Sequence, residues 1–117
     1  MGQNHDRWRQ PGARFLQHGV VMADLIHTHS ARVSGPDGAL YEARIYGEPD
    51  RTGLWKGWLE FRPVDRAESD SPRVLRTETE TTQPNRVALD YWAGGIEPVY
   101  LEGAFERAIH IQRTRAD

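Results

Sequence analysis

The fold is decided by residues 35–63, which read GPDGALYEARIYGEPDRTGLWKGWLEFRP. Gly, Pro and Asp gather at 35–38 and again at 48–53, and these residue types favour reversals of the chain. Between and after the two clusters, apolar side chains alternate with polar ones, which is the period of a strand with one buried face. The stretch therefore predicts two antiparallel strands, at about 39–47 and 54–63.

Two further strands are expected on either side of this hairpin. Residues 28–34 precede the first turn, and the Thr-rich residues 73–81 follow a polar loop at 64–72. Threonine is β-branched and suits a strand, and each link is short enough for an antiparallel meander. Residues 20–26 read either as a short helix or as the lead into the first strand. The buried face of the predicted sheet carries Val33, Tyr41, Ile45, Trp55, Leu59, Phe61 and Leu75.

The first predicted helix follows the Thr-rich strand. Pro84 suits the first helical position, with Thr82 or Gln83 as the cap. The run VALDYWA then places apolar residues at helical spacing. Gly94 and Gly95 are expected to end this helix.

The second predicted helix opens at Pro98 and has the clearest amphipathic pattern in the chain. Because the link between the helices is short, an antiparallel helical hairpin is expected. A sheet with one apolar face must cover that face. We therefore predict an α+β fold: a four-stranded antiparallel meander with a C-terminal helical hairpin packed on one face. The helices should contribute Val87, Trp92, Leu101, Phe105 and Ile109 to the core.

The composition indicates one small domain. The chain has 117 residues and no cysteine, and its mean hydropathy is −0.73; a domain of this size buries a core without disulfides or metals. We expect a flexible tail at 1–19 and a single domain at 20–117, with Met22 as an alternative start. No apolar run approaches the ~20 residues of a membrane helix. A cytoplasmic protein is therefore expected, and no motif implies a cofactor.

The charge and the motifs narrow the function. A net charge of −2 argues against a duplex-DNA binder, which needs a basic surface. The chain has no cysteine and no G-x-S-x-G motif, so nucleophilic catalysis has little support. The leading hypothesis is a non-enzymatic interaction module, acting through its sheet face or its helical hairpin. The alternative from another class is a small enzyme or ligand-binding domain.

The polar face of the predicted sheet holds the candidate interaction residues. These are Trp58, Arg44, Tyr46, Lys56 and Arg76. Aromatic and basic residues on an open sheet suit single-stranded RNA, but glutamates on the same face cancel much of the positive charge. Trp58 is expected either to be covered by the N-terminal segment or to anchor an interface. A protein partner or self-association, as a homo-oligomer, is favoured over RNA.

A pocket between the sheet and the helical hairpin is the alternative site. Its expected residues are Thr79, Arg86, Tyr91, Trp92 and Tyr100, with Glu80 beside them. A helix N-terminus next to threonine hydroxyls and arginine could hold an anion. The competing interpretation is an ordinary helix cap with cross-strand charge pairs, and the glutamates of this segment would repel an anion.

Histidines offer a weaker, metal-binding hypothesis. His27 and His29 would point to one face of a strand, and His110 lies one helical turn after Glu106. The competing interpretation is that Glu106 and His110 belong to the solvated side of an amphipathic helix. Without a cysteine pair or an H-E-x-x-H motif, no metal is assigned.

Two resemblances add to these patterns. Residues 80–108, ETTQPNRVALDYWAGGIEPVYLEGAFERA, resemble the C-terminal signature of a family of small uncharacterised bacterial proteins. A bacterial origin is also associated with the arginine bias, because Lys56 is the only lysine among 15 basic residues. The layout of strands leading through a Thr-rich step into a helix is similar to HicB-like antitoxin domains, which engage a partner toxin. The chain lacks their glycine-cysteine turn and adds a second helix, so the resemblance implies only a binding module, of a regulatory or antitoxin-like kind.

Overall fold

The computed structural model describes residues 23–64 and 74–116. The tail expected at 1–19 and the alternative start at Met22 lie outside the described residues, as does nearly all of the polar loop expected at 64–72.

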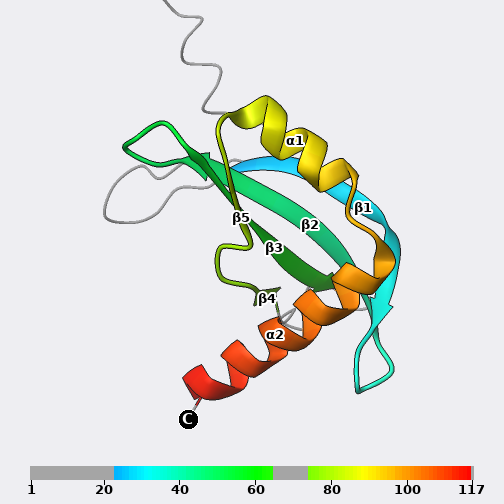
Figure 1. Cartoon of the computed structure of the whole chain (residues 1–117). Helices are drawn as coiled ribbons and strands as arrows, with labels where there is room; N and C mark the ends of the chain where they lie inside the picture. The colour runs from blue at the N-terminus through cyan, green and yellow to red at the C-terminus, as the bar shows by residue number, and fades with distance from the viewer. Residues whose placement is uncertain (1–22, 65–73, 117) are drawn as a thin grey trace, which may run out of the picture.

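Five antiparallel strands form one twisted sheet (Figure 1). The first three, β1 (Asp24–Ser34), β2 (Leu40–Pro49) and β3 (Trp55–Pro63), pair in sequence order. Two short strands, β4 (Leu75–Arg76) and β5 (Thr81–Gln83), both pair with β3 along its other edge. The predicted α+β meander is therefore confirmed, and β1 begins four residues earlier than expected.

The fourth strand is interrupted where one unbroken strand was expected. At the break, the Thr77 hydroxyl accepts a hydrogen bond from the Leu59 N–H at 3.0 Å, and the Thr77 N–H donates to the Leu59 carbonyl. A side chain thus takes the place of a backbone carbonyl in the ladder. The chain leaves the edge of the sheet at Glu78 and Thr79 and returns when the Glu80 N–H donates to the Gly57 carbonyl.

Helix α1 (Arg86–Gly94) starts later than the sequence predicted. Its cap is Asn85, whose side-chain oxygen accepts from the Ala88 N–H at 2.8 Å. The predicted caps, Thr82 and Gln83, are wrong because both belong to β5. Pro84 therefore precedes the cap instead of occupying the first helical position. Asn is among the strongest capping residues, which explains why the helix starts at this point.

The end of α1 and the start of the next helix are as predicted. Gly95 caps α1, with its N–H donating to the carbonyls of the last turn. Helix α2 (Pro98–Ala116) begins at the expected proline. The two helices diverge from their short connection, and each packs on the same face of the sheet rather than along the other helix (Figure 1). No helix in the described part of the chain is long and apolar enough to cross a membrane.

Leu89 of α1 sits on a glycine pair in the sheet. Gly47 and Gly57 lie directly opposite each other on β2 and β3. A methyl group on either glycine would collide with the Leu89 side chain, and on Gly47 it would also crowd the Lys56 carbonyl oxygen at 3.2 Å. Leu89 itself is fully buried. The two glycines therefore let the helix approach the sheet backbone closely.

The core lies between the sheet and the two helices. It contains most of the predicted residues: Val33, Tyr41, Ile45, Leu59, Phe61, Leu75, Leu101 and Phe105, with Trp92 and Ile109 packed against it. Two predictions are wrong. Trp55 lies at the end of the sheet outside this cluster, with the Arg86 guanidinium 5.6 Å from its ring centre. Val87 is 78% exposed, because α1 turns Leu89 and Ala93 toward the sheet instead.

Replacing Gly47 with alanine should destabilise the protein by about 1–3 kcal/mol, because the added methyl overpacks the contact with Leu89. Urea unfolding would measure this loss. Gly94→Ala is the matched control: no atom lies within 4 Å of the added methyl, so stability should be unchanged or up to about 1 kcal/mol higher.

The same contact predicts coupling between the two positions. In a Gly47→Ala, Leu89→Ala double variant, the smaller side chain makes room for the methyl, so the combined cost should be less than the sum of the single costs. If the two losses of stability simply add, the direct contact between Gly47 and Leu89 is contradicted.

Candidate functional site

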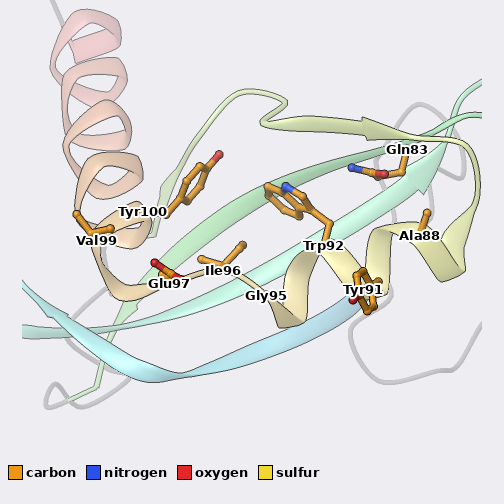
Figure 2. Close-up of a pocket in the computed structure, with 9 residues that line it drawn as sticks. All are labelled: Gln83, Ala88, Tyr91, Trp92, Gly95, Ile96, Glu97, Val99 and Tyr100. Atoms are coloured by element: carbon orange, nitrogen blue, oxygen red, sulfur yellow. The ribbon is translucent and has the colours of Figure 1, made fainter.

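A groove of about 710 Å³ lies between α1, the α1–α2 connection and the start of α2 (Figure 2). This volume is in the range of ligand-binding pockets. The lining residues come from β5 and from both helices: Gln83, Ala88, Tyr91, Trp92, Gly95, Ile96, Glu97, Val99 and Tyr100. Three of the ligand-binding residues predicted from the sequence, Tyr91, Trp92 and Tyr100, are therefore brought together. Thr79 and Arg86 are not among the lining residues.

The walls of the groove are mainly aromatic and aliphatic. Trp92 of α1 and Tyr100 of α2 face one another at 6.0 Å between ring centres, with their planes at 89° (Figure 2). Ile96, in the connection between the helices, lies below them. Tyr91 and Val99 are 86% and 70% exposed. The groove thus combines two half-buried rings with two freely accessible apolar side chains.

A three-residue clamp holds the α2 wall in place. The Tyr100 hydroxyl donates to Glu80 Oε1 at 2.5 Å. Arg107, two turns further along α2, donates to both oxygens of the same carboxylate, at 2.6 and 3.2 Å. The Arg107 guanidinium also lies 5.5 Å from the centre of the Tyr100 ring. Glu80 therefore connects the segment between β4 and β5 to α2. The connection is strong, because hydrogen bonds to an ionised carboxylate are stronger than those between neutral groups.

The clamp keeps Tyr100 in its neutral form. Burial of the hydroxyl, together with its hydrogen bond to Glu80 and the charge of that carboxylate, raises the pKa of Tyr100 to about 12, although Arg107 acts in the other direction. The hydrogen bond to Glu80 likewise raises the pKa of Arg107. At neutral pH the phenol is a hydrogen-bond donor and not a base.

His29 fixes the connection between the helices from the side of β1. Its Nε2 lies 2.8 Å from the Ile96 carbonyl oxygen, and its Nδ1 accepts from the Ala31 N–H at 3.0 Å. These partners assign a neutral ring with the proton on Nε2. No sequence pattern indicated this role, because the contact joins residues 67 positions apart.

The metal-binding hypothesis gains no support from this arrangement. Both ring nitrogens of His29 are already engaged, so a metal would have to replace one of its hydrogen bonds. The His27 ring lies beside it, at 6.2 Å between centres, whereas His110 is exposed on α2. Within residues 23–64 and 74–116, no three side chains of the metal-binding types gather into a site.

The opposite face of the sheet is not an open aromatic platform. Tyr46 and Trp58 form a stacked cross-strand pair and are only 3% and 4% exposed, so the expectation that Tyr46 lies on an exposed face is wrong and Trp58 offers no accessible ring. Ala23 belongs to the same buried cluster, and Arg76 lies over the Trp58 ring at 4.4 Å. Of the two alternatives for Trp58, coverage by the N-terminal segment is the one that the described residues support, because Ala23 and Leu25 pack in the cluster around this ring.

The basic residues of that face are largely matched by carboxylates. Arg44 pairs with Glu42 at 3.3 Å, and a hydrogen bond with Tyr46 raises the Arg44 pKa. Arg62 lies 3.5 Å from the buried Glu60. Lys56 and Arg76 are the exposed cations among the predicted interaction residues. The described part of this surface therefore offers no accessible ring from Tyr46 or Trp58 on which single-stranded nucleic acid would stack.

The N-terminus of α1 shows the same local pairing. Arg86 forms an ion pair with Asp24 of β1 at 2.5 Å. Its charge is therefore compensated. Thr79 is exposed and does not line the groove. The residues predicted to hold an anion are thus not assembled around a common point.

No protein-family model, curated protein or solved structure matches the chain. The resemblances to a small bacterial family and to HicB-like domains therefore remain predictions.

The clamp predicts a specific loss of stability at alkaline pH. Because the pKa of Tyr100 rises from 10.0 to about 12 on folding, the unfolded chain releases this proton first. The stabilisation is complete below about pH 10 and is lost between about pH 10 and 12. Urea unfolding of the wild type and of Tyr100→Phe should show a shallower fall in the variant over this window. Equal slopes would contradict the clamp.

Proposed function

We propose that the chain is a non-enzymatic binding module, and that the groove between α1 and α2 holds an apolar segment of a partner protein. The supporting observation is the gathering of accessible apolar side chains around one groove: Tyr91 and Val99 line it, and Val87 lies one turn before Tyr91 on the same helix. Contiguous apolar surface of this kind marks interaction sites. Tyrosine and tryptophan are also enriched among the residues that dominate binding energy.

The helical side of the molecule is the better candidate of the two that the sequence left open. On the sheet side, Tyr46 and Trp58 are buried, so they cannot serve as anchors without a rearrangement. On the helical side, Tyr91 projects from a helix that is itself held against the sheet by Leu89. An interface on this side needs no structural change, which lowers the cost of binding.

The polar groups next to the groove support binding more than catalysis. Glu80 is already engaged by Tyr100 and Arg107, and Tyr100 stays protonated at neutral pH. A general base needs a pKa near the working pH and access to a substrate proton. These groups instead maintain the shape of the groove wall.

The proposal predicts that binding depends on the groove rim. Purified wild type, a Tyr91→Ser, Val99→Ser double variant and a Leu40→Ser control would each be used to retain proteins from a native lysate. Leu40 is also an exposed apolar residue, but it lies at the start of β2 and does not line the groove. A specific partner should be retained by the wild type and the control and lost by the double variant, with unchanged melting temperatures.

Self-association is the homo-oligomeric form of the same proposal. Light scattering would then show a dimer for the wild type and the Leu40→Ser control and a monomer for the double variant. In that case the partner is a second copy of this chain. Identical retained proteins and identical masses for all three chains would contradict a role for the groove.

A small-molecule ligand is the second candidate, favoured by the volume of the groove and its mainly aromatic and aliphatic lining. Measuring the melting temperature with a set of small molecules would distinguish a small-molecule ligand from a partner protein. A ligand of the groove should raise the melting temperature of the wild type, since it binds only the native state. It should have no such effect on Trp92→Ala.

A further inference from the structure

We propose that the groove recognises one cationic side chain within the apolar partner segment, the ammonium or guanidinium group of a lysine or arginine, placed against Trp92 and Tyr100 and next to Glu97. This inference rests on the proposed function and specifies the chemistry of the partner.

Trp92 is the first reason. The structure describes three tryptophans, and two of them have an arginine over the ring: Arg86 over Trp55 at 5.6 Å and Arg76 over Trp58 at 4.4 Å. Among the described residues, no cation lies over Trp92, although its ring lines an open groove. Tryptophan has the aromatic face that attracts cations most strongly. Of the three described tryptophan rings, the one that lines the groove is thus the one over which no described cation lies.

The perpendicular arrangement of the rings is the second reason. With planes at 89°, Trp92 and Tyr100 form a corner with two aromatic walls (Figure 2). A cation in this corner would contact both rings, as in the aromatic cages that bind alkylammonium groups. Arg107 already lies against the Tyr100 ring at 5.5 Å. The chain itself therefore shows that this ring accommodates a cation.

The charge of the lining is the third reason. Among the residues that the structure describes, the lining of the groove contains one carboxylate, Glu97, and no lysine or arginine. No ion pair or hydrogen bond joins the Glu97 side chain to any other described residue. Arg107, the basic residue beside Tyr100, is neutralised by Glu80. A positive group in the groove would therefore meet an unpaired carboxylate and no competing cation.

A pair of small probes tests the charge directly. n-Butylammonium chloride and 1-butanol have the same alkyl chain, with and without a positive charge. Each would be titrated into the full chain while the indole N–H signal of Trp92 is followed by NMR, with sodium chloride matching the ionic strength. Trp92→Phe identifies this signal by its loss. Butylammonium should shift the signal saturably, at least threefold more tightly than butanol.

The variants separate the contributions of the carboxylate and the ring. Glu97→Gln keeps the size of the side chain and removes its charge, so butylammonium should bind about three- to fivefold more weakly while butanol is unaffected. Glu102→Gln is the matched control, because Glu102 is an exposed glutamate of α2 that does not line the groove. It should leave both probes unchanged.

The outcomes distinguish this inference from the proposed function. Equal binding of the two probes, or equal effects of Glu97→Gln and Glu102→Gln, would overturn the recognition of a cation and leave an apolar groove. A Trp92 signal that moves with neither probe would also overturn it. The proposed function is decided separately, by whether the Tyr91 and Val99 double variant loses its partner.

Discussion

The close approach of α1 to the sheet, through Leu89 on Gly47 and Gly57, is the constraint on which the helical side of the molecule depends. The Leu89 side chain is fully buried against two glycines that lie opposite each other. Moving α1 away from the sheet or rotating it would remove this side chain from its close-packed contacts. The rotation that buries Leu89 turns Tyr91 to solvent and leaves Trp92 at the groove. The position of Trp92 in the groove wall thus follows from two glycines in the sheet, Gly47 and Gly57, which leave room for Leu89.

The other wall is held by contacts between distant parts of the chain. The edge strand breaks where the Thr77 hydroxyl takes over a backbone hydrogen bond, and this break brings Glu80 to α2. His29 of β1 meanwhile holds the connection between the helices through the Ile96 carbonyl. Since each wall has its own attachment to the sheet, the groove is formed in advance of any partner. Such preorganisation reduces the entropy lost on binding.

The sequence predicted those features that depend on repeating patterns. The alternation in β2 and β3 and the helical period after Pro98 each involve several residues, so neither depends on one position. The prediction of which face of α1 is buried was wrong. The run VALDYWA has apolar residues on more than one side of the helix, so the helical period did not distinguish Val87 from Leu89. The sequence also predicted that Tyr91, Trp92 and Tyr100 share one pocket. It could not supply His29, whose partner is a backbone carbonyl 67 residues away.

Several polar groups are used to hold elements of the fold in place, and for this reason the proposed recognition is assigned to the aromatic lining. Asp24, Glu80 and His29 are each committed to an internal partner that holds an element in place. A site whose charged groups are used in this way has little left with which to perform acid–base chemistry. The ring of Trp92 and the carboxylate of Glu97 are the lining groups that no described cation engages. The proposed recognition of a cation rests on these two groups, because an electron-rich ring face and a carboxylate favour a positive charge in the same direction.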